Sequence, residues 1–191
     1  MLVVALTVAG CGSNPQSPDW IVLIDGDKGM DNWYVTGSAA NWRGEGGAIQ
    51  ADKTAGKGAS VLASKRTFKD HAVYVEFWAA DETNSGVYGH APKTKRINTA
   101  SGAYEVQIWD RNPNAHYSTG SLVNVASVQP IYKAGGRWNT FEIHARGTEI
   151  TVKMNGVVTA SITNAKTHEG RIGLQFNAGP VKFRKLLVKE L

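Results

Sequence analysis

The sequence predicts an all-β fold in which antiparallel strands form a sandwich or jelly roll. Short stretches of β-forming residues alternate between apolar and polar side chains with a period of two, as in the strands of a half-buried sheet. Gly, Asn and Asp separate these stretches, and the chain contains 21 glycines. No segment of helical length shows the apolar period of about 3.6 residues that an amphipathic helix needs. Many short strands with turn residues between them are typical of sandwiches and jelly rolls.

The expected strands follow one another along the body of the chain. The first strand ends at the Asp25-Gly26 turn, and the next two flank the Gly- and Lys-rich stretch 52–58. Nearer the C-terminus, Asn155-Gly156 separates two strands and is a strong signal for a β-hairpin. In order, strands are expected at 20–25, 47–50, 59–64, 72–80, 85–90, 102–110, 137–145, 150–154, 157–162, 171–177 and 181–191.

The strand at 102–110 carries an unusual set of side chains on one face. Successive side chains of a strand point to opposite faces of the sheet. Tyr104, Val106 and Ile108 therefore share the apolar face, and Glu105, Gln107 and Trp109 share the other. A carboxylate, an amide and an indole in one row form a poor core. They suit a sugar, because its hydroxyls bind polar groups and its ring face stacks on an aromatic side chain.

Length and charge limit the partners that the chain is expected to have. The 191 residues carry a formal net charge of +5 at pH 7, and residues 19–191 are long enough for a single domain. A basic chain can indicate nucleic-acid binding. Here Lys and Arg are scattered, with short clusters only at 93–96 and 182–189, so we expect no nucleic-acid partner.

The N-terminal 18 residues are typical of an export signal. Residues 1–10 are apolar and end in small residues directly before Cys11, the only cysteine. The sequence Val-Ala-Gly-Cys resembles the lipobox of bacterial lipoproteins, in which the cysteine is lipidated and becomes the first residue of the mature protein. Residues 11–18 would then be the lipidated cysteine and a flexible tether. The expected location is the bacterial cell envelope, with the body attached through the lipid on Cys11, either in the periplasm or on the cell surface.

Two observations bear on that signal. No Lys or Arg precedes the apolar run, although signal peptides normally begin with positive charge, and we therefore expect that the start of this one lies upstream or has been trimmed. The alternative is a buried N-terminal strand with a free cysteine. The residues around Cys11, Gly-Cys-Gly-Ser-Asn-Pro, favour the signal because they would break such a strand.

Short motifs occur in a fixed order along the body of the chain: Trp78, Asn84-Ser85-Gly86-Val87-Tyr88, Gly102-Ala103-Tyr104-Glu105-Val106-Gln107, Trp138-Asn139-Thr140, Asn155-Gly156, Gly173-Leu174-Gln175 and Gly179-Pro180-Val181-Lys182-Phe183-Arg184. Together these motifs resemble the 3-keto-disaccharide hydrolase family, formerly a domain of unknown function. The resemblance runs from about residue 20 to the C-terminus. The resemblance implies a concanavalin A-like jelly roll of two curved antiparallel sheets. It also implies hydrolysis of glycosides whose sugar is oxidised at C3.

The chain departs from the family pattern at two positions. Asn177 stands where the family tends to have His, and His90 stands where an Arg or Lys often closes the Asn-Ser-Gly-Val strand. If either position takes part in proton transfer, the chemistry of this chain is altered.

Glu105 and Glu76 are the predicted catalytic residues. A glycosidase normally needs two carboxyl groups that flank the scissile bond, and these two lie in phase on strands whose opposite faces are apolar. A concave face would gather them with the substrate-binding residues Tyr74, Asn84, Ser85, His90, Gln107, Trp109, Gln175 and Asn177. For Glu76 a solvated sheet face is the competing explanation, and for Asn84 and Ser85 it is a turn that enters the strand.

A 3-keto sugar also permits elimination, because its carbonyl acidifies the proton on C2. A base removes that proton, the group on C1 leaves, and water adds to the resulting enone. In this scheme Glu105 is the base and Glu76 the acid or an orienting group, and Asn84 or Gln107 donates to the carbonyl oxygen.

We expect no cofactor. The five histidines lack the spacing of a transition-metal site, and no phosphate-binding loop is present. A structural calcium ion is an option that Asp81, Glu82 and Asp110 would serve. Two other functions remain open at this point: a non-catalytic carbohydrate-binding lipoprotein with the same fold, and a scaffolding lipoprotein of the envelope.

Overall fold

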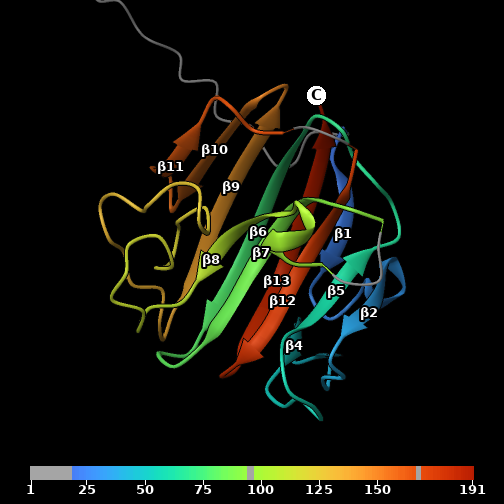
Figure 1. Ribbon diagram of the computed structural model, residues 1–191. Helices are drawn as coiled ribbons and strands as arrows, with labels where there is room; N and C mark the ends of the chain where they lie inside the picture. The colour runs from blue at the N-terminus through green and yellow to red at the C-terminus, as the bar shows by residue number, and fades with distance from the viewer. Residues whose placement is uncertain (1–18, 94–96, 167–168) are drawn as a thin grey trace, which may run out of the picture.

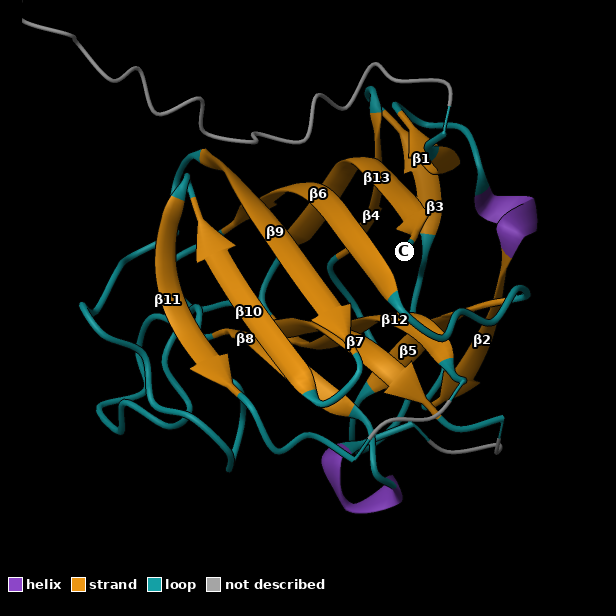
Figure 2. Ribbon diagram, turned by 90° about the horizontal axis from the view of Figure 1, so that it is seen from above, coloured by secondary structure: helices purple, strands orange, loops and turns teal. Residues whose placement is uncertain are grey.

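The computed structural model describes residues 19–93, 97–166 and 169–191, which form two antiparallel sheets packed face to face (Figure 1). The predicted signal, the tether and Cys11 lie outside the described residues. Figure 2 shows the two layers from above, with the strands of the larger sheet arching over the smaller one. The predicted all-β jelly-roll sandwich is therefore confirmed.

The larger sheet has eight strands. Seven of them lie in the order β11 (Val157–Ile162), β10 (Glu149–Met154), β9 (Trp138–Arg146), β6 (His71–Ala79), β13 (Val181–Glu190), β4 (Ala48–Ala51) and β3 (Arg43–Glu45). The eighth, β1 (Ile21–Asp25), also pairs with β13.

The smaller sheet has five strands, and it carries the site described below. Their order is β2 (Trp33–Gly37), β5 (Ser60–Ser64), β12 (Arg171–Ala178), β7 (Asn84–Ala91) and β8 (Tyr104–Ile108). The described residues also form two short 3₁₀ helices, η1 (Met30–Asn32) and η2 (Thr99–Ser101). No helix among the described residues is long and apolar enough to cross a membrane.

The core lies between the sheets and is built from the apolar phase of each strand. Phe77 of β6 and Phe141 of β9 stack with ring centroids 4.6 Å apart. They belong to one buried cluster with Leu174 of β12 and Val106 of β8, which reach in from the smaller sheet. The alternation seen in the sequence thus assigns one face of each strand to the core and leaves the other for solvent or function.

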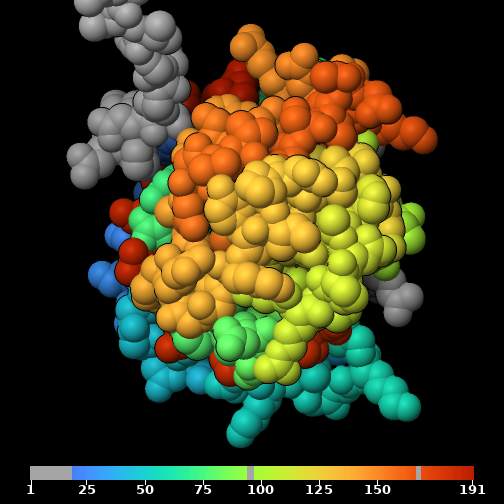
Figure 3. Space-filling view, turned by 90° about the vertical axis from the view of Figure 1, so that its left-hand side faces the viewer, coloured from blue at the N-terminus to red at the C-terminus, as the bar shows by residue number. Residues whose placement is uncertain are grey.

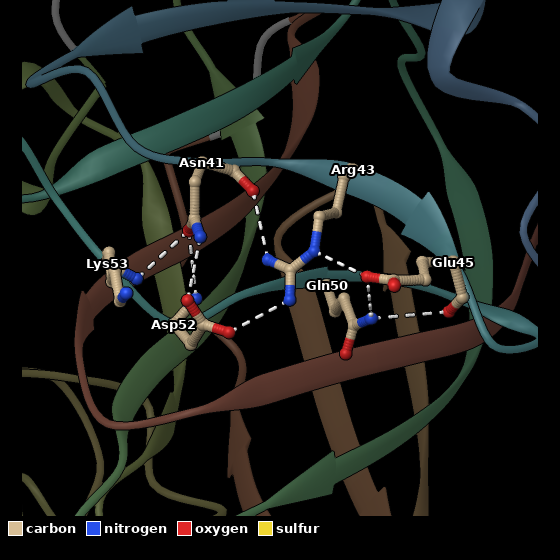
Figure 4. Close-up of polar contacts among 6 residues, drawn as sticks. All are labelled: Asn41, Arg43, Glu45, Gln50, Asp52 and Lys53. Atoms are coloured by element: carbon tan, nitrogen blue, oxygen red, sulfur yellow. Dashed lines mark hydrogen bonds and ion pairs between the residues drawn. The ribbon is translucent and has the colours of Figure 1, made fainter.

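Two strands, β2 and β3, have no counterpart in the sequence prediction. The sequence of β3, Arg-Gly-Glu, contains no strong β-former, so pairing with β4 and a polar network hold this edge (Figure 4). Arg43 lies at the centre of the network, with its Nε 2.7 Å from Glu45 and its Nη2 2.9 Å from Asp52. These contacts are exposed, and such pairs contribute little to stability, but they fix the position of an edge strand.

A long segment of loops, residues 111–136, closes one side of the sandwich. Its backbone bonds to the edge of the smaller sheet through Gln107 N and Ser121 O, 3.0 Å apart. It also reaches the edge of the larger sheet, where Gln129 N lies 3.1 Å from Thr159 O. Figure 3 shows this segment, coloured yellow-green to gold, as a continuous cover. It therefore protects the edge strands β8 and β11 from pairing with other chains.

Candidate functional site

A pocket of about 570 Å³ lies on the outer face of the five-stranded sheet. Its floor is formed by side chains of β5, β7, β8 and β12, and its walls by residues 37–38, 57–59 and 97–99. The polar residues that line it are Ser38, Lys57, Tyr88, Asn98, Thr99, Glu105 and Gln175. A pocket of this size and polarity suits a small polar ligand.

Strand register brings Glu105, Tyr88 and Gln175 together. Glu105 of β8 pairs with Tyr88 of β7, and Gln175 of β12 pairs with Gly86, the neighbour of Tyr88 on the same face. Their neighbours in sequence, Val87, Val106 and Leu174, are buried in the core. The three polar side chains therefore point outward because their neighbours in sequence point inward.

Two glycines leave room for these side chains. A Cβ atom on Gly86 would lie 2.7 Å from Oε1 of Glu105, so the carboxyl group lies directly over that glycine. A Cβ atom on Gly173 would lie 3.2 Å from the Tyr88 side chain. Each glycine thus accepts a neighbouring functional side chain that a larger residue would displace.

The carboxyl group of Glu105 is buried and hydrogen-bonded. Nε2 of Gln175 donates to Oε1 of Glu105 at 2.7 Å and to the hydroxyl oxygen of Tyr88 at 2.6 Å. Burial raises the pKa of Glu105 to about 7, and hydrogen bonds from Tyr88 and Gln175 offset part of that rise. Burial and the charge of Glu105 raise the pKa of Tyr88. Near neutral pH the carboxyl group can therefore give or take a proton, while the phenol stays protonated.

Of the predicted site residues, Glu105 and Gln175 line the pocket. Gln107 lies on the same face of the sheet but is buried, and its side-chain oxygen accepts from the backbone N–H of Ile108 at 3.0 Å. Asn84 and Trp109 are half-buried and Asn177 is exposed, towards the far end of β7, β8 and β12. These four residues are not part of the pocket lining.

The predicted pairing of Glu76 with Glu105 is wrong. Glu76 belongs to β6 in the larger sheet and points away from the core, so the whole sandwich separates it from Glu105. Tyr74 lies beside it, and its hydroxyl donates to Oε1 of Glu76 at 3.0 Å. Arg184 neutralises the other carboxylate oxygen. Alternation shows which residues face outward, but it does not show to which sheet a strand belongs.

The predictions for Ser85 and His90 as substrate contacts are also contradicted. Ser85 is fully buried on the core side, where its hydroxyl donates to the backbone oxygen of Gln175 at 2.6 Å. His90 adopts a positive φ of 52° beside a register shift, which turns its ring inward. The ring packs on His71 with centroids 4.8 Å apart, and only 1% of His90 is exposed.

Sequence reasoning missed Tyr88, Lys57 and Asn98 as pocket residues. Tyr88 had a usable signal, because it lies two residues after Gly86 on a strand whose Val87 is apolar. Lys57 and Asn98 come from loops, and periodicity does not indicate where a loop folds.

The candidate calcium ligand Asp110 already has partners for both carboxylate oxygens. Oδ1 accepts from the Thr119 hydroxyl at 2.6 Å, and Oδ2 accepts from the backbone N–H groups of Ala134 and Gly135 at 2.7 and 2.8 Å. Within the described ranges, no group of three or more His, Cys, Asp or Glu side chains is arranged to hold a metal ion.

Solved structures with the same fold include carbohydrate-related proteins. A proposed glycosyl hydrolase from Parabacteroides distasonis superposes with a TM-score of 0.76 at 16% identity, covering 90% of this chain and 94% of its own. A Bacillus subtilis protein with a galectin-like fold gives 0.67 at 11% identity, covering 85% and 90%. The carbohydrate-binding module CBM66 of Bacillus subtilis gives 0.58 at 12% identity, covering 83% and 96%.

At these identities the solved structures show a shared fold. Among curated proteins, none matches the sequence significantly. A family model does match, and it spans nearly all of the described body, from residue 19 to residue 189. The sandwich, its carbohydrate-related neighbours and this match agree, and the chain belongs to the family of the 3-keto-alpha-glucoside-1,2-lyase-like domain.

Proposed function

We propose that this protein cleaves a glycosidic bond next to a 3-keto sugar, with Glu105 as the general base. The observation that carries the proposal is the Glu105 carboxyl group, which is buried in a polar pocket and has a pKa of about 7. A base whose pKa lies near the working pH is the most effective proton acceptor. Family membership and the carbohydrate-related neighbours support a sugar as the substrate.

One carboxyl group is enough for an elimination route. Ionised Glu105 takes the proton from C2 of the sugar, and the C2–H electron pair moves into the enolate of the C3 carbonyl. The enolate then expels the group on C1, whose oxygen takes the proton that Glu105 now carries, so the carboxylate is regenerated and an enone remains. Water adds across that enone, so the overall reaction is hydrolysis. Direct displacement needs a second carboxyl group at the scissile bond, and among the described residues Glu105 is the only carboxylate that lines this pocket.

Neighbouring groups can stabilise the ionised carboxylate of Glu105 and the developing enolate. Tyr88 stays protonated, because burial and the charge of Glu105 raise its pKa, and it can stabilise the ionised carboxylate by donating to it. Lys57 lines the same pocket and supplies a positive charge for the developing enolate oxygen.

We further propose export and lipid attachment at Cys11, on the sequence pattern of residues 1–18.

Turnover tests the proposal directly. The protein from residue 12 onward is incubated with a 3-keto-disaccharide and, separately, with the same disaccharide in its unoxidised form, and released monosaccharide is measured. Release from the oxidised sugar alone is expected, since only that sugar has an acidic C2 proton. Equal release from both sugars would contradict elimination.

A non-catalytic carbohydrate-binding protein is the second candidate. The described residues give the pocket one carboxylate, which favours this candidate over a two-carboxylate hydrolase, and CBM66 shares the fold. Binding of both disaccharides without release of monosaccharide would establish this second function. A scaffold is less well supported, because polar side chains line the pocket.

A further inference from the structure

A second hollow adjoins the Glu105 pocket on the same face of the five-stranded sheet. It measures about 460 Å³, and its lining includes Tyr34, Val35, Gly37, Ala63, Lys93 and Arg171. Gly37 lines both hollows, and Ala63 in this hollow lies two residues from Val61 in the other. The two hollows therefore form neighbouring parts of one surface across β2, β5 and β12.

Arg171 is held in this hollow by fixed contacts. Its Nη1 donates to the backbone oxygens of Ser64 and Lys65, the latter at 2.9 Å. The guanidinium carbon lies 4.8 Å from the ring centroid of Tyr34, which is 41% exposed. Both hydrogen bonds come from a single nitrogen, whereas a guanidinium carries five N–H donors. The group is thus oriented in advance and keeps donors for a ligand.

The charge of this surface is positive. Among the described residues, no carboxylate pairs with Arg171, and its backbone partners leave its charge uncompensated. Lys93 pairs with Glu169 at 3.2 Å, but both side chains are more than half exposed, so the pair is weak. Lys57 adds another cation at the first pocket, whose lining in the described part of the chain holds one carboxylate, that of Glu105.

We infer that the hollow around Arg171 and Lys93 binds an anionic group on a sugar unit distant from the cleaved bond. This inference rests on the proposed function and narrows the substrate class to acidic oligosaccharides. Arg171 binds the anion through its planar fork of donors, a geometry that suits carboxylates and sulfates alike.

Strand register sets the distance between the two parts. Glu105, Tyr88, Gly173, Ala63 and Tyr34 form one row across the five strands. With neighbouring strands roughly 4.8 Å apart, the ends of this row are about 19 Å from each other. The guanidinium of Arg171 lies over the ring of Tyr34, at the far end of this row. One sugar ring at Glu105 does not reach that end, so the anionic group belongs to a later ring of the same chain.

Calorimetric binding of three matched trisaccharides tests the inference. One carries a terminal uronic acid, one a terminal sulfate and one a neutral sugar. The acidic pair are expected to bind about ten-fold more tightly than the neutral one, as one charge-assisted contact allows. The preference should weaken at high salt. A difference between the uronic acid and the sulfate identifies which anion the hollow takes.

Single substitutions test whether Arg171 and Lys93 cause the preference for acidic trisaccharides. Arg171→Gln and, separately, Lys93→Gln should bring the ratio of acidic to neutral affinity close to one, and Arg171→Lys should restore part of it. Lys93 is exposed and outside any strand, so its variant serves if Arg171→Gln melts early. Lys153→Gln, on the opposite sheet, is the matched charge control and should keep the full ratio.

The outcomes separate the two proposals. Equal affinity of the wild-type protein for acidic and neutral trisaccharides would overturn the anionic subsite and leave the Glu105 proposal standing. Failure of all three sugars to bind, together with no turnover of the 3-keto-disaccharide, would overturn both. A preference that survives both glutamine variants would place the anion elsewhere and contradict the inference.

Discussion

Nε2 of Gln175 lies 2.7 Å from Oε1 of Glu105, although the two residues are 70 positions apart in the chain. They reach each other across β7, where Gly86 has no side chain to separate them. The same amide nitrogen donates to Tyr88. A buried carboxyl group is thus fixed by two neutral groups, and its protonation depends on them.

Tyr88→Phe should raise the pKa of Glu105 above its present value of about 7. The Tyr88 hydrogen bond lowers that pKa, and removing it favours the neutral carboxyl group. In the profile of kcat/KM against pH, the rise on the acidic side should move to higher pH, because the base must be ionised. Tyr74→Phe, on the other sheet, should leave the profile in place. An unchanged profile for Tyr88→Phe would contradict the role of Tyr88.

Gly86→Ala should lower activity while the protein stays folded. The new Cβ atom would lie 2.7 Å from Oε1 of Glu105, so the carboxyl group must move. A displacement of about 1 Å can cost up to 100-fold in rate. Gly89→Ala is the matched control, because it lies on the same strand and its Cβ atom would meet His71 at an ordinary 3.5 Å. Full activity in Gly86→Ala, with an unchanged melting temperature, would refute the crowding argument.

Glu105→Gln should stabilise the protein in mildly alkaline solution. The folded protein keeps the Glu105 proton up to a pKa of about 7, whereas the unfolded chain loses it near 4.5. Stability therefore falls as the pH rises between these values. The variant lacks this penalty, and at pH 8 its free energy of unfolding should be higher by up to about 3 kcal/mol. Urea titrations at pH 4 and pH 8 measure the difference, which should vanish at pH 4.

His71→Leu should protect the protein against acid. Burial, assisted by His90, lowers the pKa of His71 to about 4, whereas an unfolded histidine titrates near 6.5. The unfolded chain binds a proton in this window and the folded protein does not, so stability falls as the pH drops from 6.5 to 4. The variant should lose less stability than the wild type between pH 7 and pH 4.5, as followed by thermal melting. If the variant and the wild type lost the same stability between pH 7 and pH 4.5, another group would be the cause of the acid sensitivity.

The sequence was sufficient to predict most of the strands and most of their faces, because alternation of apolar and polar residues records burial directly; β2 and β3 were missed. Glu105 and Gln175 were assigned to an outward face on this basis, and they do line the pocket. The assignment of strands to sheets could not be predicted. β6, which carries Glu76, belongs to the larger sheet. The next two strands, β7 and β8, belong to the smaller sheet, and β8 carries Glu105, so the two carboxylates lie on opposite outer surfaces.

Local backbone geometry limited the prediction in another way. Strict alternation would place His90 on the same outward face as Tyr88. Its positive φ and the adjacent register shift turn the ring into the core instead. A bulge of this kind depends on the partner strand, which the sequence of β7 does not specify.

Turnover of a 3-keto-disaccharide by two single-carboxylate variants tests the central claim most directly. Glu105→Gln keeps the size of the side chain and one oxygen that can accept from Gln175, but it removes the base, and kcat should fall by about 100-fold or more. Glu76→Gln makes the same chemical change on the opposite sheet and should keep wild-type kcat. Wild-type turnover by Glu105→Gln, or a loss confined to Glu76→Gln, would contradict the assignment of Glu105 as the base.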